Sequence, residues 1–234
     1  MKLLAFETAT EACSVALWVD GEVRERFELA PRRHAELSLP WAEQLLAEAG
    51  IGKSQLDAIA VGRGPGAFTG VRLAIAIAQG IALALDRPIV PVSTLAALAM
   101  QAPAIDGPCV LAAIDARMGE VYAGRYQRSD DGMVAVTRET LAAPDAVPLP
   151  DDGSHWHGVG TGFAASDGML AQRLALRLAT VDATALPHAA DVARLAAAAY
   201  LRGEAVAADL VEPAYLRNNV ALTIAEQQTL RASR

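Results

Sequence analysis

Cysteine is scarce in this sequence, since Cys13 and Cys109 are the only two among 234 residues. Each lies in an apolar, strand-like stretch, which fits a reduced and buried thiol better than a disulfide framework. No apolar run reaches the roughly 20 residues that a bilayer span requires. Glu7 also follows the start of the chain too closely for the apolar region of a signal peptide. We therefore expect a cytoplasmic protein that has no membrane segment.

Basic residues are also few. Lysine occurs only at Lys2 and Lys53, and 20 lysines and arginines stand against 27 aspartates and glutamates, which gives a formal net charge of -7. Affinity for nucleic acid depends largely on the neutralisation of phosphates, so this balance argues against a chain that binds a polyanion alone. If a nucleic acid is involved, we expect a partner to carry the basic surface.

The chain is organised around residues 61–85, where an apolar strand end leads through a glycine-rich loop into a long apolar helix. Glycine allows a positive φ and lets an anion or another backbone segment approach closely. The loop lacks the Lys-Ser/Thr ending of a P-loop and the spacing of a dinucleotide-binding fingerprint. We therefore favour a tight strand-to-helix turn over a phosphate cradle, with Thr69 as the expected N-cap. The structural residues of this loop are Gly64, Pro65, Gly66 and Gly70.

Two predicted helices carry more apolar surface than one sheet can cover. The segment 34–49 has two apolar stripes, and Pro40 is tolerable there only if the helix starts near Ser38. The helix at 73–85 is apolar nearly all round, so one face is expected on a sheet and the other under a second helix, domain or chain. The second stripe of 34–49 is an interface candidate, with cover from within the chain as the alternative. The residues predicted for partner contact are Leu37, Leu39, Trp41, Ala42, Leu45, Leu46, Arg72, Ile75, Ala78, Gln79 and Ala82.

The pattern of the chain begins again after its first hundred residues. An apolar strand that ends in a carboxylate occurs at 2–7 and again at 111–115. Each is followed by two more strands, and the last two strands of each set join at an Asp-Gly turn, at Asp20-Gly21 and at Asp131-Gly132. This order predicts an α/β protein in which a βββαβα unit is used twice.

Three regions follow from that repeat. We expect an N-terminal lobe over 1–104 that carries the partner-binding helices and a C-terminal lobe over 105–217. The remaining residues, 218–234, form a polar tail that is either a short helix or disordered.

Two lobes with a cleft between them are the organisation of the actin, Hsp70 and sugar-kinase (ASKHA) superfamily, in which ATP binds in the cleft on two strand-turn loops. The equivalent loops here are 7–11 and 115–119. The first has no glycine, and in the second Arg117 and Met118 stand where phosphate oxygens need to approach the backbone. We therefore expect a retained fold with a degraded nucleotide site and no firmly bound cofactor. The weak cofactor-binding candidates are Glu7, Thr8, Glu11 and Asp115.

Three separated stretches, in order along residues 1–217, resemble those of a known family. They are 64–72 with the sequence GPGAFTGVR, 115–122 with DARMGEVY, and 213–217 with PAYLR. Together they are similar to the signature stretches of the TsaB family, formerly YeaZ, of bacterial threonylcarbamoyladenosine biosynthesis proteins. Ala67 stands where this family often has serine, which is a minor departure.

The resemblance implies a paralogue of the catalytic subunit TsaD. Together with TsaB and the ATPase TsaE, TsaD transfers a threonylcarbamoyl group to adenosine 37 of tRNAs that read ANN codons. The partners implied are TsaD and TsaE, or a second copy of the chain when TsaD is absent. The complex uses the ATP, and the chain meets tRNA only through the complex.

The resemblance also implies a missing metal site. TsaD-like chains bind a metal through two histidines spaced i, i+4, and the matching positions here are Thr94 and Leu98, neither of which can replace a histidine ligand. We therefore expect a non-catalytic scaffold with no metal site and no catalytic residue. The alternative is an ATP-dependent enzyme that works in its own cleft, with Glu7, Glu11 and Asp115 around Mg²⁺.

The histidines offer no competing site. His155 and His157 share one face of a strand without a third ligand in view, so a plain surface strand is favoured over a metal site. His34 starts a helix with no acid or nucleophile placed beside it, and His188 caps or packs against the helix expected at 189–201. No spacing indicates a Ser/His/Asp or Cys/His arrangement, so protease chemistry has no support.

Overall fold

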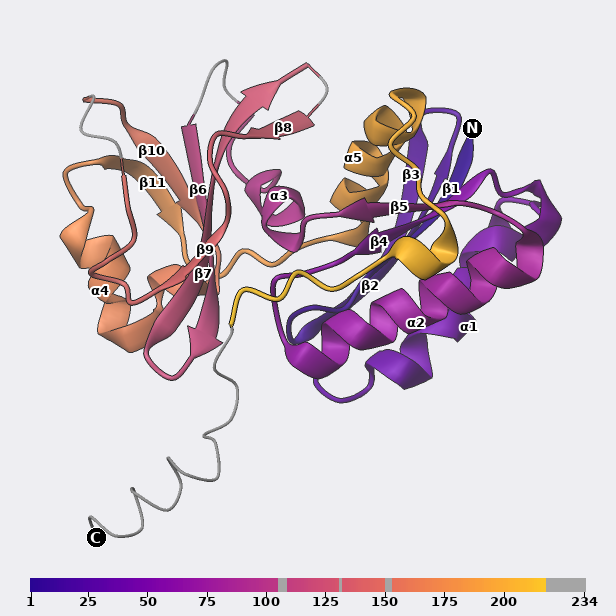
Figure 1. The fold of residues 1–234 in the computed structure, drawn as a ribbon, viewed down its shortest axis with the longest axis horizontal. Helices are drawn as coiled ribbons and strands as arrows, with labels where there is room; N and C mark the ends of the chain where they lie inside the picture. Colours follow the sequence, from indigo (N-terminus) through magenta and orange to yellow (C-terminus); the bar gives the residue numbers. More distant parts are fainter. Residues whose placement is uncertain (105–108, 131, 150–152, 218–234) are drawn as a thin grey trace, which may run out of the picture.

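The computed structural model describes residues 1–104, 109–130, 132–149 and 153–217, which form two α/β lobes (Figure 1). In the first lobe five strands form one sheet in the order β3-β2-β1-β4-β5. The first three strands are antiparallel, as predicted, and β4 and β5 continue the sheet in parallel with β1. The elements are β1 (Lys2–Glu7), β2 (Ala12–Val19), β3 (Glu22–Leu29), α1 (His34–Glu48), η1 (Lys53–Gln55), β4 (Ala58–Gly62), α2 (Phe68–Leu85), β5 (Ile89–Val92) and α3 (Thr94–Ala99).

The second lobe contains the other sheet, in the order β11-β10-β6-β7-β8, with β9 paired to β7. Strands β6, β7 and β8 are antiparallel, and β10 and β11 continue the sheet in parallel with β6. The elements of this half of the chain are β6 (Cys109–Arg117), β7 (Glu120–Ser129), β8 (Gly132–Ala135), β9 (Thr140–Ala142), β10 (Trp156–Val159), η2 (Thr161–Phe163), α4 (Ala165–Arg173), β11 (Leu178–Asp182), α5 (Ala189–Leu201) and η3 (Ala208–Leu210), of which α5 and η3 pack on the first lobe.

The two sheets match strand for strand, because β3-β2-β1-β4-β5 corresponds to β8-β7-β6-β10-β11. The predicted duplication is therefore confirmed for the strands. A helix was also expected between the third and fourth strands of each copy, and in the second copy this prediction is wrong. The described residues between β8 and β10 form β9 and irregular chain, and Pro144 and Pro148 there deny a helix its backbone donors. Asp131, half of the predicted second turn, lies outside the described residues.

Each half of the chain lends a helix to the other half. Leu95 and Leu98 of α3 lie in one core cluster with Val110 and Ala112 of β6. The alanine-rich face of α5 packs in the opposite direction, against small side chains of β1, β2 and β4 in the first sheet. Both helices therefore lie between the two sheets (Figure 1). The boundary predicted near residue 104 separates the strands of the two lobes but not these two helices, and the boundary segment 105–108 lies outside the described residues.

Helix α1 begins at His34, so the prediction that Pro40 forces a start near Ser38 is wrong. Pro40 has no N–H group, and the carbonyl group of Glu36 one turn earlier therefore has no helical partner. Glu36 and Pro40 both lie on the exposed side of the helix, where water can bond to that carbonyl group. Ser38 lies on the buried side and donates a hydrogen bond to the carbonyl oxygen of His34 at 2.7 Å.

Helix α2 begins at Phe68 after Ala67, whose backbone is extended, and no side chain caps its start. Thr69 lies inside the first turn, so the prediction of Thr69 as N-cap is wrong. The following helix, α3, is capped by a side chain, because the Ser93 hydroxyl accepts a hydrogen bond from the Ala96 N–H at 3.1 Å. Within the described residues, α2 is the one helix long and apolar enough to cross a membrane by composition. Its inner face packs on the first sheet.

Candidate functional site

The turn between β1 and β2, where the superfamily holds one side of a nucleotide, is built around a buried carboxyl group. Glu7 ends β1 and is 1% exposed. Its Oε1 accepts a hydrogen bond from the Ala9 N–H at 2.7 Å, and its Oε2 accepts one from the Thr94 hydroxyl at 2.8 Å. A side chain at Gly62 would overlap this carboxyl group, so the glycine makes room for it. Ala9, Thr94 and Gly62 thus surround the Glu7 carboxyl group.

Burial changes the pKa of the Glu7 carboxyl group. Removal from water raises the pKa of Glu7 to about 7, against hydrogen bonds from Ala9, Thr94 and Thr8 that act in the opposite direction. A carboxyl group of this kind is partly protonated near neutral pH. That state makes it a poorer ligand for a divalent cation than an exposed carboxylate, since hard cations prefer charged oxygen ligands.

The glycine-rich loop packs directly on this turn. The Thr8 hydroxyl donates to the carbonyl oxygen of Gly70 at 2.7 Å, and the Ala67 N–H donates to the carbonyl oxygen of Ala9 at 2.7 Å. A Cβ atom at Gly70 would overlap the carbonyl oxygen of Thr8, so glycine is needed for the close approach of two backbones. The loop is therefore the tight turn that was favoured from sequence, and its glycines meet protein backbone where a phosphate cradle would meet an anion. Glu11 is exposed at the end of the turn.

The second strand-turn loop, between β6 and β7, is also satisfied by the chain itself. Asp115 accepts hydrogen bonds from the Arg117 N–H at 2.7 Å and from the Arg117 guanidinium at 2.8 Å. Arg217, far away in sequence, donates to the carbonyl oxygen of Ala116 at 3.0 Å and forms an ion pair with Glu120 at 2.7 Å. Arg117 thus binds the Asp115 carboxylate, and Arg217 fastens the backbone of this turn.

The positions of the metal-binding histidines of TsaD-like chains are part of the core. Thr94 is completely buried, and its hydroxyl accepts from the Gly64 N–H at 3.1 Å while it donates to Glu7. Leu98 is completely buried against the second sheet. Among the described residues, no group of three or more His, Cys, Asp and Glu side chains could hold a metal ion.

The remaining histidines have structural contacts. His157 is buried in β10 and bonds to the Thr180 hydroxyl at 2.7 Å, whereas His155 is exposed. The ring of His34 bonds to the carbonyl oxygens of Thr10 and Ala12 at 3.0 and 3.2 Å, which ties the start of α1 to the β1–β2 turn.

His188 and Glu25 join the last helix to the first sheet. His188 Nδ1 lies 2.9 Å from the Glu25 carboxylate, and its ring stacks on Phe27 with centroids 4.1 Å apart. This hydrogen bond raises the pKa of His188. Burial raises the pKa of Glu25, but hydrogen bonds from His188, Ser14 and the Ala190 N–H outweigh it and hold the pKa below its usual range. The cluster thus fixes the start of α5 on the first sheet, which agrees with the expected packing role of His188.

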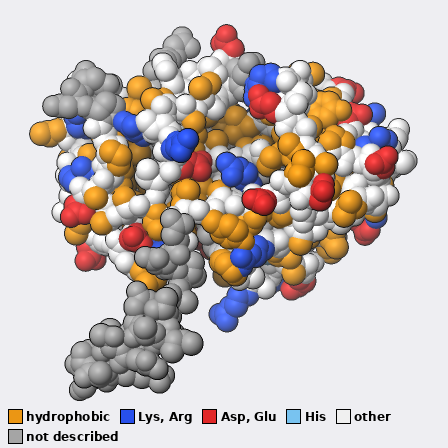
Figure 2. Space-filling model, viewed as in Figure 1, with side chains coloured by type: hydrophobic (Ala, Val, Ile, Leu, Met, Phe, Trp, Pro, Cys, Tyr) orange, Lys and Arg blue, Asp and Glu red, His pale blue; other side chains and the backbone are white. Residues whose placement is uncertain are grey.

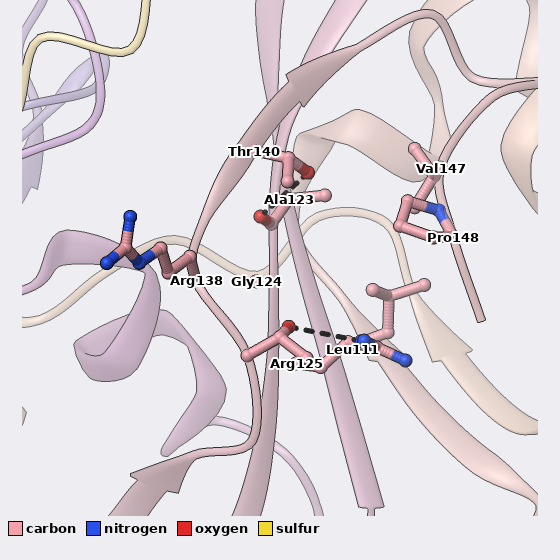
Figure 3. A pocket seen from close by; sticks show the side chains of 9 residues that line it. Leu111, Ala123, Gly124, Arg125, Arg138, Thr140, Val147 and Pro148 are labelled. Carbon is pink, nitrogen blue, oxygen red and sulfur yellow. Dashed lines mark hydrogen bonds between the residues drawn. The ribbon is translucent and has the colours of Figure 1, made fainter. Parts of the chain in front are cut away.

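Two hollows lie away from these turns. A cavity of about 10 Å³ beside β7 is lined by Leu111, Gly124 and Thr140, and Arg138 points away from it (Figure 3). That volume suits one water molecule at most. A larger groove of about 450 Å³ opens between the lobes, where hydrophobic side chains show in the hollow of the surface (Figure 2). Its lining residues are Pro91, Val92, Ala96, Ser129, Met133, Val134, Leu195, Ala199 and Arg202.

The residues predicted for partner contact divide into two groups. The buried group packs in the first core, so these side chains are not available to a partner in this conformation, and the prediction is corrected for them because the apolar stripe they form faces the sheet. That group is Ala42, Leu45, Leu46, Ile75, Ala78 and Ala82. The other predicted residues are exposed or half-buried, and they are Leu37, Leu39, Trp41, Arg72 and Gln79.

Two exposed residues that the sequence did not single out, Phe68 and Leu83, complete this side. Leu83 and Phe68 of α2 are 69% and 56% exposed, and Leu39 of α1 is 49% exposed. The Arg72 guanidinium lies 3.3 Å from the centre of the Phe68 ring and donates to the Tyr215 hydroxyl at 2.9 Å. The all-round apolar pattern of α2 indicated a second covered face, but helical spacing alone did not show which residues lie on it.

The comparisons with known proteins agree with this geometry. Residues 28–225 match the family model described as TsaD: tRNA N6-adenosine threonylcarbamoyltransferase. The tRNA threonylcarbamoyladenosine biosynthesis protein TsaB of Escherichia coli is 45% identical over 226 residues, which cover 94% of this chain and 96% of that protein. The protein of the same name from Haemophilus influenzae is 42% identical over 231 residues, with 94% and 95% covered.

Solved structures show the same similarity. YeaZ from Pseudomonas aeruginosa superposes with a TM-score of 0.81 at 45% identity, over 92% of this chain and 99% of that one. A second structure, titled as similar to peptidase YEAZ from Pseudomonas aeruginosa, reaches a TM-score of 0.85 at 47% identity over 92% and 99%. Together with the duplicated two-lobed fold, these matches show that the chain belongs to the TsaB (YeaZ) family.

Proposed function

We propose that this chain is a non-catalytic subunit of tRNA threonylcarbamoyladenosine biosynthesis that binds TsaD through the exposed surface of α1 and α2 and supports it together with the ATPase TsaE. The observation that carries the proposal is the apolar outer face of α2. Only a third of this 18-residue apolar helix is buried. Phe68 and Leu83 are exposed on this helix, and large exposed apolar surfaces mark interaction sites. A second copy of the chain covers the same surface when TsaD is absent.

The two strand-turn loops support a scaffold over an enzyme. Glu7 bonds to Ala9 and Thr94, and Asp115 bonds to Arg117, so the carboxylates that a Mg-ATP site would use already have protein partners. Catalysis of phosphoryl transfer depends on positioning and neutralising phosphates, and these carboxylates are engaged within the protein instead. No cofactor is therefore assigned to this chain, and the ATP of the pathway is used by the complex.

The overall charge supports a complex in which another subunit binds the tRNA. With a formal net charge of -7, the chain is poorly suited to hold tRNA alone. In this proposal tRNA meets the chain only within the complex, in the cytoplasm. TsaD supplies the transferase chemistry.

The interface is tested by a charge placed on the exposed face. Leu83→Arg is expected to weaken the complex with TsaD by roughly 30-fold or more, because hot-spot side chains contribute about 2 kcal/mol or more. Leu176→Arg is the matched control, since Leu176 is 91% exposed in the second lobe. Affinity is measured by titration calorimetry after both variants are shown to melt as the parent does. Equal affinity for TsaD in both variants would contradict the assigned surface. Leu46→Arg is unsuitable because Leu46 is 4% exposed and lies in the core.

The role is tested by reconstitution with one component left out. Modified adenosine is measured in a mixture of tRNA, threonine, bicarbonate, ATP, TsaD and TsaE, with and without this chain and with its Asp115→Ala variant. We expect modification to need the chain and to tolerate the substitution. If the variant assembles normally but modification is abolished, the cleft of this chain binds nucleotide or does chemistry, and the alternative of an ATP-dependent ASKHA enzyme replaces the scaffold.

A further inference from the structure

The last part of the described chain crosses from the first lobe to the second. Residues 211–217, called the strap from here on, leave η3 beside α2 and run to the start of β7 (Figure 1). The strap begins in the first core, where Val211 is buried. The Gln79 side chain donates to the carbonyl oxygen of Ala208 at 2.8 Å, and the Ala214 N–H donates to the carbonyl oxygen of Arg63 at 2.9 Å. As far as Ala214, therefore, the strap belongs to the first lobe.

The end of the strap is bound by the second lobe. Arg217 donates to the carbonyl oxygens of the β6–β7 turn, to that of Ala116 at 3.0 Å and that of Arg117 at 3.5 Å. Its guanidinium also forms an ion pair with Glu120 at 2.7 Å, and the Arg217 side chain is only 16% exposed. Charge-assisted hydrogen bonds of this kind are stronger than neutral ones. Two residues after Tyr215, which still contacts Arg72 of α2, the strap is thus tied to the second lobe.

The strap lies away from the other junction of the lobes. That junction is made by α3 and α5, which pack between the two sheets, and the strap crosses on the other side of the view (Figure 1). Rotation of two lobes about packed helices is a common domain motion. Such a rotation here would change the distance between Ala214 and the β6–β7 turn. The contacts of Arg217 oppose that change.

The middle of the strap touches the exposed end of α2. The Tyr215 hydroxyl accepts from Arg72 Nε at 2.9 Å, and the Arg72 guanidinium also stacks on the Phe68 ring. Tyr215 and Phe68 are 55% and 56% exposed. A protein that covers this end of α2 would exclude water from the Arg72–Tyr215 hydrogen bond and so strengthen it.

We propose that the strap is a latch, in which Arg217 holds the second lobe in one orientation against the first and Tyr215 couples this orientation to occupancy of the exposed end of α2. The latch is a property of the chain alone. The coupling rests on the proposed function, because it needs a partner on α2.

The latch is tested by measuring the distance between the lobes. Spin labels are placed at Gln44→Cys on α1 and Leu176→Cys after α4, both exposed sites, in a chain with Cys13→Ala and Cys109→Ala. Double electron-electron resonance is expected to give a single distance distribution for this chain. Arg217→Ala is expected to broaden or shift it by roughly 5 Å or more, as a released domain does. Arg117→Ala is the control, because its guanidinium bonds to Asp115 within the second lobe.

Hydrogen exchange in the chain with native cysteines gives a second readout. The Ala214 amide is expected to exchange about tenfold faster in Arg217→Ala than in Arg117→Ala, because the strap opens locally. An unchanged distance distribution and unchanged exchange in Arg217→Ala would overturn the latch. Equal changes in both variants would also overturn it, since they would reflect disruption of the turn itself.

The coupling is tested by adding TsaD to the labelled chain. We expect TsaD to narrow the distance distribution, and we expect Tyr215→Phe to bind TsaD without that narrowing, because it lacks only the hydroxyl group. Narrowing that persists in Tyr215→Phe would overturn the coupling. Failure of TsaD to bind the labelled parent would count against the proposed function, while the measurements on the chain alone still decide the latch.

Discussion

The two copies of the repeated unit share their strands and differ in their outer layers. Helix α2 follows β4, and α4 follows the corresponding strand β10. Helix α2 runs without interruption for 18 residues, whereas α4 is broken by left-handed backbone at Ser166, Asp167 and Gly168. Helix α1 covers the first sheet beside α2, and the described residues of the second copy contain no counterpart (Figure 1). The sheets thus preserve the repeat, and the first copy retains a long apolar outer layer that is suited to association.

The strand-turn loops show the same divergence in their chemistry. Glu7 ends β1 and Asp115 lies near the end of the corresponding strand β6, but Glu7 bonds to Ala9 and Thr94 whereas Asp115 bonds to Arg117. The carboxyl groups of Glu7 and Asp115, at equivalent positions of the fold, therefore have different kinds of partner. The difference between backbone packing in one copy and side-chain bonding in the other can be tested directly.

The largest expected effect comes from adding a methyl group to a glycine in the first turn, compared with the same change in the second turn. Gly70→Ala places a methyl group on the carbonyl oxygen of Thr8 and is expected to lower the free energy of unfolding by at least about 3 kcal/mol. Gly119→Ala in the second turn meets no atom within 4 Å and carries only the cost of left-handed backbone at φ +75°, about 1–2 kcal/mol. Urea denaturation measures both. Equal losses would show that the two turns are not filled differently.

The next effect concerns the buried carboxyl group of the first copy. The pKa of Glu7 is about 7 in the folded chain and 4.5 ordinarily, so the folded chain binds the proton more tightly. The stability that this provides is complete below pH 4.5 and is lost as the pH rises through 7, a change of roughly 3 kcal/mol. Glu7→Gln is expected to remove that part of the pH dependence in urea denaturation between pH 5 and 8. A variant whose stability falls as steeply as that of the parent would contradict the burial of an ionisable group here.

The smallest expected effect comes from replacing one glycine in each outer helix, Gly80 in α2 and Gly168 in α4. Gly80→Ala meets no atom within 4 Å in the exposed part of α2 and is expected to stabilise the isolated chain by about 1 kcal/mol. Gly168→Ala in α4 is expected to destabilise it by about 1 kcal/mol or more, because its φ of +74° is strained for alanine. Thermal melting of the isolated chain distinguishes the signs. Shifts in the same direction would mean that α2 and α4 do not differ in backbone regularity as described.

The order of the strands along the chain could be predicted because most strands have a local sequence pattern. Alternating or continuous apolar residues bounded by turns identified the first three strands of each copy, and the Asp20-Gly21 turn paired β2 with β3, whereas β9 and β11 were not predicted. The loss of the second-copy helix was harder to predict, since it depends on prolines at 144 and 148 within an otherwise unremarkable stretch. The start of α1 was missed because Pro40 lies on the side of the helix that faces water, which periodicity does not weigh.

The contacts of the site depend on residues far apart in sequence. Arg217 lies within a stretch that resembles the family, yet nothing local shows that it bonds to Ala116 about a hundred residues earlier. The burial of Glu7 needed Thr94 and Gly62 from two other segments. On α2, where almost every residue is apolar, spacing could not separate the side that faces the sheet from the side that faces solvent. Ile75 and Ala78 were therefore assigned to a partner although they lie in the core.

The return of α5 to the first sheet also has a consequence during synthesis on the ribosome. The face of that sheet lined by Ala5, Ala16 and Ala60 is covered mainly by α5, which begins at Ala189. At about 5–20 residues per second, the ribosome needs roughly 5–20 s after β5 to produce this cover. Alanine exposes little apolar area, so a nascent chain in this interval presents a weakly adhesive surface. The small side chains that later let α5 approach the sheet closely thus also limit aggregation of the unfinished protein.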